Sequence, residues 1–174
     1  MNKKTENYAF IDSQNLIFAT KSLGWEIDFE RFYIYLHAKY GITKAFLFMG
    51  YISENKMLYE KLKSFGYKII FKPVVRHTKK EIIKGNVDAE LVLHAAKIEF
   101  HNYEKAIIIS NDGDFHCLVE HLVEENKLLK LITPSMKYSS LLRRFSSFIV
   151  PVPLFKLNIR LKYNNKKRAF PRYG

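Results

Sequence analysis

Short apolar runs alternate with longer amphipathic stretches along this chain, and this alternation restricts the folds that it can adopt. The run AIII at 106–109 is β-branched after its alanine, which indicates a strand buried on both faces. The expected strands are residues 8–11, 45–49, 67–71, 106–109, 128–132 and 148–150. The expected helices are residues 28–40, 54–65, 87–100, 115–124 and 139–145. Strands that alternate with helices favour βαβ units, so we expect an α/β fold with a mainly parallel sheet covered by helices on both faces.

The third expected helix has a clear inward face. Its apolar residues Val87, Leu91, Ala95 and Ile98 follow helical spacing, which predicts that all four face the core. The first expected helix is rich in aromatic rings, in the run FYIYLHAKY, and we interpret these rings as core rather than as a platform for nucleobases.

The charge of the chain is concentrated at one end. The 174 residues carry a net charge of +12, and residues 1–125 contain 17 basic and 17 acidic side chains. Residues 126–174 contain 12 basic side chains and no acidic one, so they carry the whole excess. The length fits a single domain, and we predict a domain over residues 1–155 followed by a basic tail at 156–174.

The basic tail has two possible roles. Lys166, Lys167 and Arg168 lie among aromatic residues such as Phe170 and Tyr173. Cations that meet phosphates and rings that meet unpaired bases are typical of proteins that hold single-stranded RNA. The alternative is a solvated tail that only improves solubility, and the tail alone does not decide between these roles.

Composition excludes several classes of protein. Cys117 is the single cysteine, which excludes an internal disulfide framework and every zinc site with several cysteines. No apolar run approaches the roughly 18 residues that cross a bilayer. The first ten residues lack the apolar core of a secretory signal. We therefore expect a cytoplasmic protein whose partner is a polyanion.

Acidic side chains follow two of the expected strands directly. Asp12 ends the first strand, while Asp112 and Asp114 follow the fourth, and Asp88 lies in the first turn of the third helix. Each acid also has an ordinary explanation, because a first-turn carboxylate complements the helix dipole and N-D-G-D is a typical turn. Carboxyl ends of parallel strands meet at one edge, however, so we expect these acids to lie close together.

Carboxylates that cluster raise one another's pKa unless a cation neutralises them. Hard oxygen ligands suit Mg²⁺ or Mn²⁺, which also bind phosphate oxygens and activate water. Lys84, Gly85 and Asn86 precede the third helix and add a cation and NH groups where a phosphate docks. The residues therefore indicate metal-assisted phosphoryl chemistry.

Three short motifs resemble the NYN domain family of the PIN-like nuclease superfamily. They are F-I-D-S-Q-N at 10–15, K-G-N-V-D-A-E-L at 84–91 and I-I-I-S-N-D-G-D-F at 107–115, and the resemblance covers roughly residues 8–150. It implies a Rossmann-like three-layer α/β/α sandwich and an endoribonuclease that depends on Mg²⁺ or Mn²⁺. The family's catalytic, metal-binding acids fall by position on Asp12, Asp88, Asp112 and Asp114.

The same resemblance suggests roles for polar neighbours of these acids. Asn15 is expected to orient Asp12 or to contact substrate, and Ser110 is expected to be a polar neighbour of the metal. His94 is a departure, because many relatives have an aspartate there. His94 either binds a metal ion or packs as an ordinary helix side chain. Whether the site holds one metal ion or two depends on which of these roles it has.

These observations lead to the hypothesis of a metal-dependent endoribonuclease that acts on single-stranded RNA. Lys84, Lys166, Lys167 and Arg168 are the expected contacts to the RNA backbone. The alternative is an RNA-binding or scaffold protein with the same fold and no turnover. A phosphatase of the haloacid dehalogenase type needs a second aspartate where this chain has Gln14. A homodimer is possible, with only the aromatic content in its favour.

Overall fold

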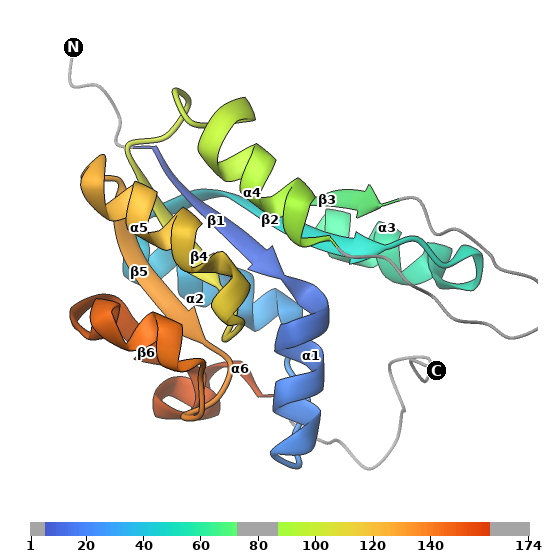
Figure 1. The fold of residues 1–174 in the computed structure, drawn as a ribbon. Coiled ribbons are helices and arrows are strands. Elements are labelled where there is room, and N and C mark those ends of the chain that lie inside the picture. Colours follow the sequence, from blue (N-terminus) through green and yellow to red (C-terminus); the bar gives the residue numbers. More distant parts are fainter. Residues whose placement is uncertain (1–5, 73–86, 161–174) are drawn as a thin grey trace, which may run out of the picture.

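A computed structural model describes residues 6–72 and 87–160 of the chain (Figure 1). Within them, six parallel strands form one sheet in the order β3-β2-β1-β4-β5-β6. The strands are β1 (Asn7–Asp12), β2 (Ile42–Gly50), β3 (Tyr67–Lys72), β4 (Lys105–Ile109), β5 (Leu128–Thr133) and β6 (Ile149–Pro151). The strands expected from the sequence are all present, which confirms the predicted parallel sheet.

Helices connect the strands and cover the sheet. The α-helices are α1 (Ser13–Ser22), α2 (Phe29–Tyr40), α3 (Lys56–Ser64), α4 (Asp88–Leu93), α5 (His116–Glu124) and α6 (Lys156–Ile159). The 3₁₀ segments are η1 (Ser53–Asn55), η3 (Gly113–Phe115), η4 (Ser140–Phe148) and η5 (Val152–Phe155), and η2 (His94–Ile98) is π-helical. Each expected helix has a helical counterpart, and the residues of the last one form the 3₁₀ segment η4.

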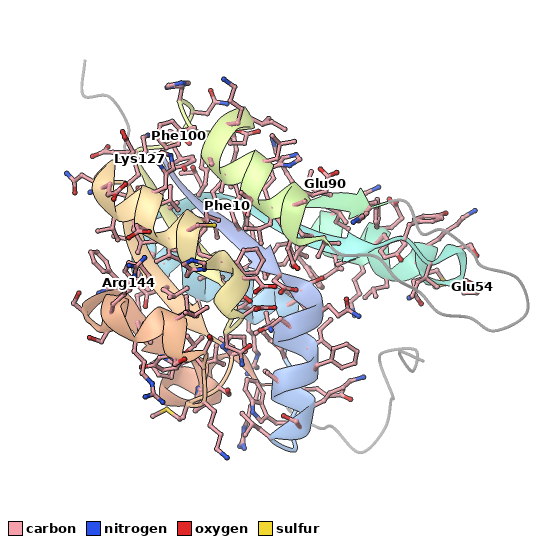
Figure 2. The ribbon with its side chains drawn as sticks, viewed as in Figure 1. Phe10, Glu54, Glu90, Phe100, Lys127 and Arg144 are labelled. Carbon is pink, nitrogen blue, oxygen red and sulfur yellow. The ribbon has the colours of Figure 1, made fainter. Side chains whose placement is uncertain are left out.

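Two apolar layers sandwich the sheet. Ile11 of β1 packs on one face with Leu16 of α1 and Leu36 of α2. Phe10, the preceding residue, packs on the other face with residues of α4 and α5, as Figure 2 shows. Successive residues of a strand point to opposite faces, so a strand buried on both sides has no polar position. The fold is the three-layer α/β/α sandwich that the resemblance implied.

The order of the strands fixes where a site is expected. After β1 the chain builds outward through β2 and β3, then returns to pair β4 on the other side of β1. In open sheets of this kind, ligands bind outside the carboxyl ends of the strands at such a reversal. β1, which ends at Asp12, and β4, which Asp112 follows, flank this point.

The helix expected over residues 87–100 contains a π-helical turn. The Glu99 amide donates to the His94 carbonyl at 2.9 Å, a spacing of five residues instead of four. Leu91 and Ala95 are buried as predicted, but Ile98 is 50% exposed, so its predicted inward position was wrong. The wider turn rotates the residues after it away from the spacing of a regular helix.

The π-helical turn contacts a buried tyrosine, which leads to a stability prediction. The Tyr103 hydroxyl donates to the Ala95 carbonyl at 2.7 Å, and its ring packs against Tyr8 and Phe10. Tyr103→Phe keeps the ring and removes only this hydrogen bond, so we expect the free energy of unfolding to fall by about 1 kcal/mol. Urea denaturation measures the change. Tyr51→Phe, at an exposed ring, is the control, and equal stability of both variants contradicts a role for the bond.

The folded domain extends beyond the predicted boundary at residue 155. Ile159 is fully buried, and its carbonyl accepts a hydrogen bond from the Asp28 amide at 2.8 Å. Arg160 forms an isolated antiparallel bridge with Ile27. The first part of the predicted tail therefore packs on the domain, because Ile159 belongs to the core beside α2. Lys166, Lys167 and Arg168 lie outside the described residues. In the described ranges, no helix has the length and apolar character to cross a membrane.

Candidate active site at the carboxyl ends of the central strands

Asp12 lies where β1 ends and α1 begins. It caps α1, because its Oδ1 accepts a hydrogen bond from the Asn15 amide at 3.0 Å. Its Oδ2 accepts from the Ser110 hydroxyl of the neighbouring strand end at 3.3 Å. Ile11 and Ile109 are partners in the register of β1 and β4, so Asp12 and Ser110 follow side by side. The carboxylate is only 5% exposed.

The turn after β4 joins the second acid to this group. The Asp112 amide donates to the Ser110 hydroxyl oxygen at 3.2 Å, so Ser110 links both acidic residues. Asp112 Oδ1 accepts from the Asp114 amide at 3.0 Å and caps η3. The Asn15 side-chain oxygen accepts from the Asn111 amide at 3.1 Å. The side chain of Asn15 thus holds the turn after β4, and its backbone NH is the group that contacts Asp12.

The electrostatics bring a third acid into the same site. The pKa of Asp12 is raised from its ordinary 3.8 to about 6, chiefly by burial and also by the charges of Asp88 and Asp112, while hydrogen bonds from Asn15 and Ser110 oppose the shift. Asp88 is the first residue of α4, on the sheet face that α4 and α5 cover. Asp88 and Asp112 therefore both act on Asp12, whereas Asp114 is exposed and contacts Asp112 through its backbone.

The question for these acids is whether so few carboxylates could hold a magnesium or manganese ion. Among the described residues, no group of three or more His, Cys, Asp or Glu side chains is arranged to hold a metal ion. Mg²⁺ does not require such a cage, because it keeps several waters and takes one or two carboxylates plus substrate phosphate. Asp12, whose pKa is raised by burial and by the charges of Asp88 and Asp112, is the carboxylate that would serve such an open site.

The His94 side chain is packed inside the fold, which is one of the two roles, metal ligand or packed side chain, that the sequence left open. Its ring lies 5.4 Å from the Phe48 ring in an edge-to-face arrangement. Its Nδ1 lies 2.9 Å from the Glu90 carbonyl oxygen, one turn earlier in the helix. The imidazole thus contacts β2 and its own helix.

A loop after β5 supports the acidic turn, and the sequence did not reveal it. Asn111 Nδ2 donates to the Ser135 hydroxyl at 3.4 Å and to the Lys137 carbonyl at 3.3 Å. The Ser139 amide donates to the Asn111 carbonyl at 3.2 Å. Gly113 lies so close to Ser139 that a Cβ there would be 2.8 Å from the serine Cβ. The glycine between Asp112 and Asp114 is the one signal in the sequence that could have indicated such a contact.

The predicted site residues thus fall into three groups. Asp12, Asn15, Ser110 and Asp112 are joined by hydrogen bonds, and Asp88 joins them through its charge. Asp114 lies at the exposed end of the turn. The expected RNA contacts are outside the described residues: Lys84, Lys166, Lys167 and Arg168.

Comparisons with known proteins agree with this fold. The family model of the NYN domain matches residues 8–157. The chain also resembles the crystal structure of a protein of unknown function from Vibrio parahaemolyticus, with a TM-score of 0.70 and 21% identity. That match covers 92% of this chain and 99% of the other, and it shows the fold alone. No curated protein matches the chain.

Proposed function

The chain belongs to the NYN domain family of PIN-like nucleases, and on this premise we propose that it is a metal-dependent endoribonuclease acting on single-stranded RNA. The observation that carries the proposal is the group of acids at the strand reversal. Asp12 ends β1 and Asp112 follows the adjacent strand β4, both share Ser110 as a hydrogen-bond partner, and the charge of Asp88 acts on Asp12. A structural role alone does not require a buried carboxylate with two further acids close enough to raise its pKa.

In this proposal Asp12, Asp88 and Asp112 hold Mg²⁺ or Mn²⁺, and Asp114 contributes directly or through water. Such an ion supplies an activated water and offsets the charge of a phosphodiester under attack. The chain's own contacts keep the acids in place: the Asn15 amide and the Ser110 hydroxyl fix both oxygens of Asp12. Asn15 also fixes the backbone before Asp112, so both acidic segments keep one geometry without substrate.

The charge distribution supports an RNA substrate. Residues 126–174 carry the whole positive excess of the chain, which suits a phosphate backbone. We propose that Lys84, Lys166, Lys167 and Arg168 contact this backbone and that the protein acts in the cytoplasm. Deleting residues 164–174 separates their contribution from that of the acids, because it is expected to reduce the affinity and the salt dependence of RNA binding.

The deciding experiment uses a labelled circular single-stranded RNA, which has no ends for an exonuclease. We expect Mg²⁺ or Mn²⁺ to permit linearisation and EDTA to prevent it, with a circular RNA held in duplex as the less reactive control. Binding without cleavage in every divalent metal indicates the RNA-binding scaffold instead. Cleavage that continues in EDTA contradicts the metal-dependent mechanism.

A further inference from the structure

Thr133, the last residue of β5, has a buried hydroxyl that the described part of the chain leaves unsatisfied. The residue is fully buried, and its Oγ1 has no hydrogen-bond partner among the described residues. A hydroxyl that leaves water without gaining a hydrogen bond destabilises the folded state. Valine has nearly the same shape, is equally favoured in strands and carries no hydroxyl. The threonine is therefore unfavourable for the fold alone, which points to a use for its hydroxyl.

The register of the sheet places this hydroxyl beside the acidic site. Ile132 of β5 pairs with Ile109 of β4, and Ile109 pairs with Ile11 of β1. The next residue on each of these strands therefore belongs to one row across their carboxyl ends, which consists of Asp12, Ser110 and Thr133. The hydrogen bond from the Ser110 hydroxyl to Asp12 agrees with this placement.

All three side chains of the row belong to the sheet face that α4 and α5 cover. Side chains alternate along a strand, so each member of the row shares a face with the residue two positions before it. Those earlier residues are buried in the apolar layer beneath these helices: Phe10, Ile108 and Leu131. α5 lies across β4 and β5 on this face (Figure 1). The row is thus the point at which this layer changes from apolar to polar.

Ser110, in the middle of the row, can accept a hydrogen bond from Thr133. Its hydroxyl donates to Asp12 Oδ2 at 3.3 Å and accepts from the Asp112 amide at 3.2 Å. Both distances are long, since a hydroxyl bonded to oxygen ordinarily lies about 2.5–3.0 Å from it and an amide nitrogen about 2.9–3.0 Å. A hydroxyl oxygen also has two lone pairs, so Ser110 can accept once more. An unused donor and a further acceptor position therefore lie on neighbouring strand ends.

We infer that Thr133 is a positioning residue of the acidic site, whose hydroxyl donates to Ser110 when Asp12 and Asp112 close on a divalent cation. The inference rests on the proposed function and adds to it a residue that favours the loaded state. A hydrogen bond from Thr133 strengthens the one that Ser110 donates to Asp12, because bonds in a chain polarise one another. The hydroxyl is unsatisfied until then, so the chain gives up some stability in exchange for affinity for the ion.

Two variants of Thr133 test the inference, with Mn²⁺ alone as the probe and no RNA. Thr133→Val removes the hydroxyl and keeps the shape, so in EDTA we expect Tm to rise by about 3 °C. Its affinity for Mn²⁺, measured from the electron paramagnetic resonance signal of the free ion, is expected to fall about fivefold, because the loaded state loses one hydrogen bond. Thr133→Ser keeps the hydroxyl and loses a methyl group, so it is expected to lower Tm and to bind Mn²⁺ as wild type does.

Thr20→Val is the matched control, because Thr20 is also buried but its hydroxyl donates to the Ile17 carbonyl at 3.2 Å. It is not expected to raise Tm, and its affinity for Mn²⁺ is expected to equal that of wild type. A threonine with only a structural role changes stability without changing affinity for the ion. The opposite responses of the two Thr133 variants therefore distinguish a positioning role from a structural one.

The outcomes separate this inference from the proposed function. If wild-type protein binds Mn²⁺ but Thr133→Val binds it equally well, or is less stable than wild type in EDTA, the inference alone fails. It also fails if Thr133→Ser loses as much affinity as Thr133→Val. If the variants respond as expected and wild-type protein cuts no RNA, the inference holds and the proposed cleavage fails. If wild-type protein binds no Mn²⁺, both fail.

Discussion

Asp12→Asn is expected to abolish RNA cleavage and, at the same time, to stabilise the metal-free protein. In the proposed mechanism cleavage is lost because an amide lacks the charge that would help Asp88 and Asp112 to hold a divalent cation. Stability rises because the folded chain keeps a buried carboxylate beside two other acids. The asparagine side-chain oxygen still accepts the Asn15 amide, so the cap of α1 survives.

The size and the pH dependence of this stabilisation follow from the pKa of Asp12. The value of about 6 in the folded chain, against an ordinary 3.8, means that the folded state binds the proton more tightly than the unfolded state. This group's contribution to stability is therefore greatest below about pH 4, falls as pH rises to about 6, and is constant above. At pH 7 the ionised group costs about 2–3 kcal/mol, which Asp12→Asn removes. Urea denaturation at pH 4, 5, 6 and 7 in EDTA measures it.

Asp114→Asn is the control for the stabilisation, because that side chain is exposed at the end of the turn. It is expected to change stability by less than about 0.5 kcal/mol. A readout independent of cleavage is the effect of Mg²⁺ on Tm, which we expect to rise for wild type and to stay level for Asp12→Asn. If the Asp12→Asn variant is less stable than wild type in EDTA, the ionised Asp12 carboxylate does not destabilise the folded protein and this prediction is wrong.

The sequence predicted the sheet well because strand burial is local information. A run such as AIII is apolar at successive positions, so its place inside two layers is visible without the rest of the chain. It did not predict α1, because apolar spacing is weak in that helix: Ser13 and Thr20 are buried beside Leu16, while Phe18 is exposed. It also missed the π-helical turn at His94–Ile98, which has no signal in apolar spacing.

The acids were predictable for a different reason than their supports. Asp12 and Asp112 follow strands, and topology alone brings such residues to one edge. Their supports depend on contacts between distant loops: Asn111 bonds to Ser135 and to the Lys137 carbonyl, more than 20 residues later. Such pairings follow from the path of the loop after β5, and that path is set by the packing of η4 on β5.

Gly113→Ala is expected to damage the site through its contact with this loop. A Cβ at residue 113 would lie 2.8 Å from the Ser139 Cβ, closer still to the Ser139 Oγ, and 3.2 Å from the Leu141 Cδ1. Gly113 is buried, so the turn cannot relax into solvent, and we expect a loss of about 2 kcal/mol in stability. Asp112 precedes Gly113, and a displacement of about 1 Å there is expected to reduce the rate of cleavage roughly a hundredfold.

The compensating change distinguishes this contact from a general intolerance of the turn. Ser139→Gly removes both serine atoms that the new Cβ would meet, so the double variant is expected to recover at least 1 kcal/mol and much of the cleavage rate. Ser139→Ala removes only the hydroxyl and is expected to rescue less, because the Cβ at 2.8 Å remains. Greater rescue by Ser139→Gly than by Ser139→Ala would therefore show that the contact between residues 113 and 139 causes the damage. If Gly113→Ala is equally impaired beside serine, alanine and glycine, the backbone of the acidic turn is the cause and the loop after β5 does not position Asp112.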